Sequence, residues 1–140
     1  MNDHAVIEIM RKEKDTLKEL LKVLQRERDS IISFSLEGIV QENNRKEEIF
    51  NKLEYLKIEK DKLFESVDNE NKLFKSDIWK SLTAEIERTI IEIKTALQKN
   101  MKLLSFSIDY VKSSMDLILG FINSFNYGKK TEQRSFSRVV

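Results

Sequence analysis

The sequence predicts an all-α protein in which a long antiparallel helical hairpin, similar to a coiled coil, packs with a third amphipathic helix as a three-helix bundle. Three observations predict this fold class. The 140 residues contain no Pro, although average usage is about 5%, so long helices can run unbroken. Charged residues make up 35% of the chain, with 25 Lys+Arg and 24 Asp+Glu interspersed, as on solvated helix surfaces. Apolar residues recur every three or four positions in three separate stretches.

The first helix is expected over residues 3–32. Its apolar residues lie on one face, at spacings of mainly threes and fours; they are Met10, Leu17, Leu20, Leu21, Leu24 and Ile31. The segment 30–35 (Ser-Ile-Ile-Ser-Phe-Ser) then mixes β-branched residues with Ser. Ser is a favoured N-cap residue, so this segment predicts the end of one helix and the start of the next.

The second helix is expected over residues 36–67. Its apolar stripe has a period near 3.5 and consists of Ile49, Leu53, Leu56, Leu63 and Val67. Each of these two helices has about 30 residues and is therefore about 45 Å long. Two helices of equal length with a short connection should fold back as an antiparallel hairpin. Asp, Asn, Glu and Asn at 68–71 should end the second helix, because Asp and Asn side chains compete with helical backbone bonds.

The third helix is expected over residues 77–126. Its first half has a single apolar stripe, and Trp79 at its start is interpreted as a core anchor beside the second connection. The second half has two apolar stripes. One is Met101, Leu104, Ile108, Val111, Met115, Ile118, Ile122 and Phe125; the other is Leu103, Phe106, Tyr110, Leu117 and Phe121.

The two stripes lie about 115° apart and together cover about 220° of the helix circumference. Ser107 and Ser114 fill the gap between them, and Lys102, Asp109, Lys112 and Asp116 form the polar arc. A two-helix hairpin can cover only one stripe, about 100° wide. The second stripe is therefore expected either to bind an amphipathic helix of a partner or to lie in the core of a dimeric bundle.

A single helical domain is expected over residues 1–128. The segment 129–140 is polar, with Lys129, Lys130, Arg134 and Arg138 against Glu132. We expect it to be a disordered, solubilising tail. A nucleic-acid-binding arm is the weaker interpretation, because the formal net charge of the chain is only +1.

The composition argues against cofactor chemistry and catalysis. The chain has no Cys, one His (His4) and three isolated Gly. It therefore lacks the usual ligands of a zinc or iron–sulfur site, a Cys–His nucleophile pair and a phosphate-binding Gly loop. We expect no cofactor, no metal and no enzymatic activity.

The sequence also indicates where the protein resides. The absence of Cys fits a reducing compartment. Residues 1–10 have no basic segment, and the longest apolar run, 117–122, is far shorter than the roughly 18 residues of a membrane span. We expect a cytoplasmic protein without a signal peptide and without direct membrane insertion.

The pattern of the helices resembles the flagellar export chaperones of the FlgN type. In the hairpin, the similar residues are Leu-Lys-Glu-Leu-Leu at 17–21, Glu27, Ser-Leu-Glu at 35–37, Lys46, Leu53 and Leu63. In the third helix they are Asn-Met-Lys-Leu-Leu at 100–104 and Phe-Asn-Tyr-Gly at 125–128. The resemblance spans nearly the whole chain.

The resemblance implies a cytoplasmic type III secretion chaperone. Such a chaperone binds the helical end of hook-associated (hook-filament junction) proteins, prevents premature assembly and escorts them to the flagellar export gate or its ATPase complex. The client would contact Leu103, Phe106, Tyr110, Leu117, Ile118, Phe121, Ile122 and Phe125. Tyr127, with Gly128 just beyond the expected helix, would dock on the export gate.

Two other interpretations stay open from the sequence. A structural or tethering coiled-coil protein would bury the third helix in a homodimer. Another helical secretion chaperone, for the filament subunit or for a needle-type apparatus, would show the same composition. Sedimentation distinguishes the first interpretation from a client-binding monomer, and gene neighbourhood separates the chaperone classes.

Overall fold

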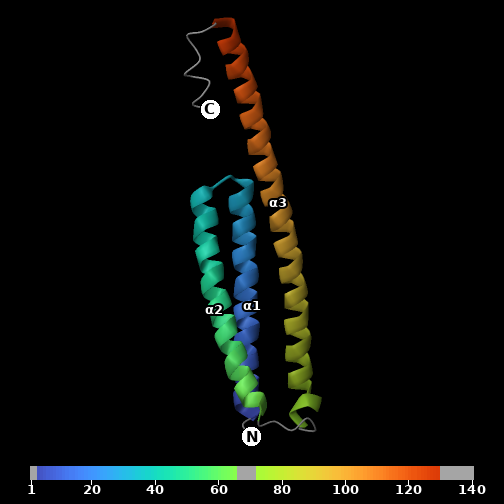
Figure 1. Ribbon diagram of the computed structural model, residues 1–140. Helices are drawn as coiled ribbons and strands as arrows, with labels where there is room; N and C mark the ends of the chain where they lie inside the picture. Colours follow the sequence, from blue (N-terminus) through green and yellow to red (C-terminus); the bar gives the residue numbers. More distant parts are fainter. Residues whose placement is uncertain (1–2, 66–71, 130–140) are drawn as a thin grey trace. The chain divides into compact units, whose positions relative to one another are not determined.

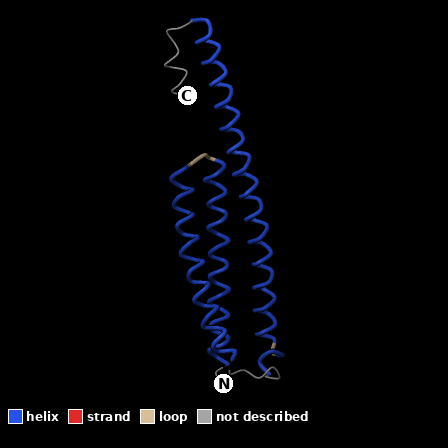
Figure 2. Tube along the Cα trace, viewed as in Figure 1, coloured by secondary structure: helices blue, strands red, loops and turns tan. Residues whose placement is uncertain are grey.

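The computed structural model describes residues 3–65 and 72–129, with side chains up to residue 124. The described residues form α1 (Asp3–Ile32), α2 (Leu36–Glu65), a short 3₁₀-helix η1 (Lys72–Lys75) and α3 (Asp77–Lys129), and none of them is in a strand (Figures 1 and 2). The helices pack against one another, which confirms the predicted all-α three-helix fold class. The chain divides into two compact units, residues 1–103 and 104–140, each considered separately below.

Parts of the expected organisation lie outside the described residues. These are residues 66–71, which include Val67 of the expected second helix and the expected turn at 68–71, and residues 130–140 of the tail expected over 129–140. The backbone of α3 is helical through Lys129. Gly128 therefore lies within the last turn of α3, whereas the sequence placed it just after the helix.

In the first unit, α1 and α2 form the antiparallel hairpin (Figure 1). The stripe predicted on α1 is buried except for Leu21, which is half-buried. From α2, Ile49 and Leu56 are buried, and Leu53 and Leu63 are half-buried. The apolar period of each helix thus forms the core between them.

The turn between α1 and α2 is a Schellman motif. The Ser35 amide donates to the Ser30 carbonyl (2.9 Å), and the Phe34 amide donates to the Ile31 carbonyl (3.1 Å). Phe34 has the left-handed backbone conformation of this motif (φ 54°). Gly is the residue most often found at this position. The Ser35 hydroxyl oxygen then accepts a bond from the Gly38 amide (3.1 Å) and caps α2. Ser35 is therefore the N-cap, within the segment 30–35 in which the sequence predicted a helix end and an N-cap.

The start of α3 is anchored to the hairpin by aromatic packing. The Trp79 ring lies 4.9 Å from that of Phe74 in η1 and 5.9 Å from that of Phe64 in α2, between ring centroids. Trp79 packs against the main core cluster, to which α3 contributes Leu82, Ile86 and Ile93. The interpretation of Trp79 as a core anchor is confirmed.

Candidate functional site

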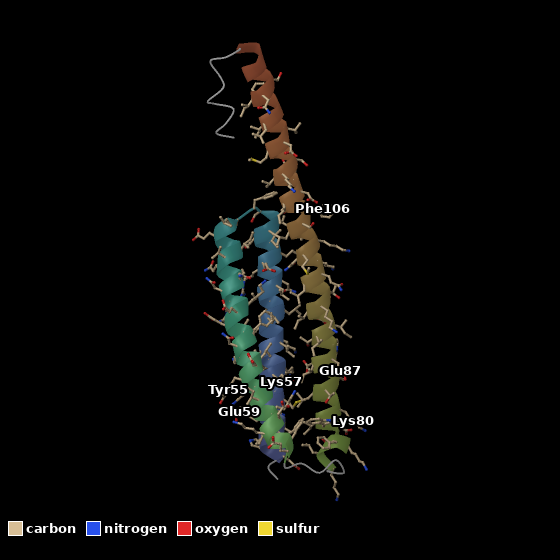
Figure 3. The ribbon with its side chains drawn as sticks, in the orientation of Figure 1. Tyr55, Lys57, Glu59, Lys80, Glu87 and Phe106 are labelled. Carbon is tan, nitrogen blue, oxygen red and sulfur yellow. The ribbon has the colours of Figure 1, made fainter. Side chains whose placement is uncertain are left out.

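The second unit contains the part of α3 that the sequence singled out. Among its described side chains, none from Leu104 to Ser124 is buried. Four large apolar residues are the most exposed: Phe106 at 71%, Tyr110 at 66%, Leu117 at 76% and Phe121 at 73%. Phe106 is labelled on α3 in Figure 3. Apolar exposure of this extent marks an interaction surface or an aggregation-prone segment.

The other apolar stripe of α3, which runs from Met101 to Phe125 and is here called the heptad stripe, is exposed as well. Its exposed members are Met101 in the first unit and Leu104, Ile108, Val111, Met115 and Ile118 in the second. A shallow apolar depression of about 380 Å³ lies along this stripe and is lined by Ser107, Ile108, Val111, Lys112 and Met115. Both stripes are thus accessible, and neither forms a core within the second unit.

The other predicted site residues differ in position. Leu103 belongs to the first unit and is half-buried, and Ile122 is half-buried in the second unit. Ile118 is exposed. It belongs to the heptad stripe and not to the stripe that contains Phe106 and Phe121. The side chains of Phe125 and Tyr127, and the surroundings of Gly128, lie outside the described residues.

The apolar arc has no charged side chain. The charges of the second unit up to Ser124 are Asp109, Lys112 and Asp116, which are exposed and belong to the polar arc. Their formal charges add to −1, so the helix has no strong field of one sign. A partner of this surface must therefore be recognised mainly by apolar contact and shape.

The first unit contains a polar cluster that the sequence analysis did not identify as a site. Glu27 of α1 is buried. It pairs with Lys46 of α2 (Nζ–Oε2, 2.5 Å) and accepts a bond from Asn100 of α3 (Nδ2–Oε1, 2.9 Å). Asn100 also donates to the Leu24 carbonyl (2.8 Å). The sequence held one indication of this cluster: Asn100 stands where the apolar residues of α3, spaced by threes and fours, would place another apolar residue.

A second connection between α1 and α3 lies on the surface. Lys18 donates a short hydrogen bond to Glu85, and Lys14 lies 4.0 Å from the same carboxylate. The hydrogen bond from Lys18, with the charges of Lys18 and Lys14, lowers the pKa of Glu85 below its ordinary value. This pair contributes to the docking of α3 in a pH-dependent way.

The described residues contain no group of three or more His, Cys, Asp or Glu side chains placed to hold a metal ion. No helix in residues 3–65 and 72–129 is both long and apolar enough to cross a bilayer.

The family model described as FlgN protein matches residues 1–135 of the 140-residue chain. The chain belongs to the FlgN family. FlgN proteins are chaperones in flagellum biogenesis and export that bind flagellar substrate proteins, and the family is not known as enzymatic. The resemblance noted from the sequence is confirmed by this match. No curated protein and no solved structure matches the chain significantly.

Proposed function

We propose that this FlgN-family chaperone acts in the cytoplasm and binds the helical end of a hook-associated protein before export. The observation that supports this proposal is the exposure of large apolar side chains from Phe106 to Phe121 on α3. An amphipathic client helix that covers this surface buries its own apolar face at the same time. The client then cannot use that face for premature assembly.

The client surface consists of the stripe Leu103, Phe106, Tyr110, Leu117 and Phe121, together with Ile118, Ile122 and Phe125. Aromatic residues supply much of the energy of protein interfaces, and four of these eight residues are aromatic, namely Phe106, Tyr110, Phe121 and Phe125. Ser107 and Ser114 lie between the two stripes. Their small side chains permit a close approach of the partner backbone.

Delivery to the export gate is assigned to Tyr127 and Gly128, at the C-terminal end of α3. This position follows the client surface along the same helix. A gate-docking residue here can act while the client surface is occupied. Client capture and gate docking are therefore separable functions of one helix.

The test is a binding measurement with purified protein and a peptide that comprises the terminal helix of a hook-associated protein from the same organism. Phe121→Asp places a charge in the apolar arc and should weaken binding by about thirtyfold or more. Asn123→Asp is the matched control, because it adds the same charge at an exposed position of the polar arc. Isothermal titration calorimetry measures both variants.

Two results would contradict the proposal. One is unchanged peptide affinity in Phe121→Asp. The other is sedimentation as a concentration-independent dimer in which residues 104–124 are protected without any client, which would favour the structural coiled-coil alternative.

A further inference from the structure

We propose that three residues, Glu27, Lys46 and Asn100, hold α3 on the hairpin near the end of the first unit. We call them the α3 latch. By holding α3 there, the latch sets the residue at which the exposed segment of α3 begins. The latch is inferred from contacts within the first unit. Its consequence for client binding rests on the function proposed above.

The latch connects all three helices through one carboxylate. Glu27 and Asn100 are 7% and 4% exposed, so both polar groups are buried. One carboxylate oxygen of Glu27 pairs with Lys46, and the other accepts from the Asn100 amide. A buried polar group without its partner is costly, so the α3 position that satisfies Glu27 is favoured over neighbouring positions.

A shallow groove opens between α1 and α3 next to the latch. Its volume is about 290 Å³, and Leu21, Leu24, Ala96 and Asn100 are among the residues that line it. Apolar contacts hold α3 from Trp79 as far as Ala96 and Leu97, which pack against the core cluster. The hydrogen bonds of Asn100 add to this attachment at the last buried residue of the described part of α3.

The latch coincides with the last buried residue of α3. Ile93 and Asn100 are buried, whereas no described residue from Met101 to Ser124 is. Opening of the latch would expose α3 back toward Ile93 and lengthen the accessible apolar segment. Asn100 is thus a positioning residue for the client surface and does not itself contact the client.

The experiment swaps the donor and the acceptor of the hydrogen bond between Glu27 and Asn100. Asn100→Asp is nearly isosteric and sets two carboxylates against each other at hydrogen-bond distance. The double variant Glu27→Gln with Asn100→Asp restores a donor–acceptor pair between positions 27 and 100, with the amide on position 27. It does not restore the bond to the Leu24 carbonyl, which needs the Asn100 amide as donor. Gln98→Asp is the matched control, since it adds the same charge two residues away at an exposed position.

The readout is amide hydrogen exchange of the full chain without client. In Asn100→Asp, protection of residues 93–103 should fall by about tenfold or more, because a released helix is marginal in water. Protection of α1 and α2 should change much less. The double variant should regain part of the protection, because only the bond between positions 27 and 100 is restored. Gln98→Asp should resemble the parent protein.

Unchanged protection of residues 93–103 in Asn100→Asp would overturn the latch, and so would a double variant that is protected no better than Asn100→Asp. If Asn100→Asp prevents folding altogether, the double variant decides: a folded chain with partial protection of residues 93–103 supports the latch, and an unfolded chain refutes it. Because no client is present, failure here is distinct from failure of the proposed function. The latter is measured by peptide affinity.

Discussion

Ser30 and Gly38 approach each other across the α1–α2 turn so closely that a side chain on residue 38 would collide with Ser30. A Cβ built on Gly38 would lie 3.0 Å from the Ser30 Cβ and 3.0 Å from the Ser35 hydroxyl oxygen, and closer still to the Ser30 hydroxyl oxygen. By contrast, a Cβ on Gly120 would meet nothing within 4 Å. The first glycine permits the tight turn, and the second makes no close contact with the part of the chain that the structure describes.

We therefore expect Gly38→Ala to destabilise the protein, because overpacking costs about 1–3 kcal/mol and the better helix propensity of Ala offsets at most about 1 kcal/mol of this cost. Gly120→Ala is the matched control, and it should stabilise the exposed helix by about 1 kcal/mol through helix propensity. Urea unfolding and far-UV circular dichroism measure both changes. Adding Ser30→Gly to Gly38→Ala should recover part of the loss, and a Gly38→Ala protein as stable as its parent would refute the close contact.

The lowered pKa of Glu85 predicts an acid-dependent loss of stability. Because the folded protein holds this carboxylate ionised, the stabilisation is present above the ordinary Glu pKa of about 4.3 and is lost as the pH falls through the lowered pKa. Glu85→Gln should flatten the pH dependence of unfolding in that acid range. Glu87→Gln removes an exposed carboxylate of the same helix (Figure 3) and should change it less. Identical pH profiles for the two variants would contradict the role of the Lys18–Glu85 pair.

Client binding should depend weakly on salt. The apolar arc of residues 104–124 has no charge, so little Coulomb attraction is available for salt to screen. We expect the affinity for the client peptide to change by less than about threefold between low salt and about 0.5 M NaCl, because steep salt dependence requires charged contacts. Titrations at several NaCl concentrations check this. A steep loss of affinity with salt would indicate that charged residues outside the arc dominate recognition.

Tyr127→Ala should separate the two functions proposed for the end of α3. The variant should bind the client peptide like the parent protein, because Tyr127 lies beyond the client surface along the helix. It should bind the cytoplasmic part of the export gate more weakly and reduce export of hook-associated proteins. Pull-down with the purified gate domain and secretion assays measure these effects, with Tyr127→Phe as the conservative control. Normal export in Tyr127→Ala would refute the assignment.

Most of the fold could be predicted from local patterns. The apolar stripe of α1 and the cap at Ser35 follow from side-chain spacing and capping chemistry, which act within one or two helical turns. The exposed arc of α3 was also predictable, because the number of apolar positions exceeded what a hairpin can cover. The left-handed Phe34 was not, since a bulky residue at positive φ opposes the local preference. Phe34 keeps this conformation because the Schellman hydrogen bonds and the close approach of Ser30 and Gly38 determine the path of the turn.

The sequence by itself determined the helices, the hairpin and the two apolar stripes between Met101 and Phe125, because apolar periodicity is a local property. Only the tertiary structure decided that Glu27, Lys46 and Asn100 meet. Asn100 and Glu27 are 73 residues apart in the chain, and periodicity does not specify which polar groups face each other at that distance. Their meeting depends on the register in which three helices pack. Through that register, the structure also decides that the buried part of α3 ends at Asn100 and that the surface available to a partner begins next to it.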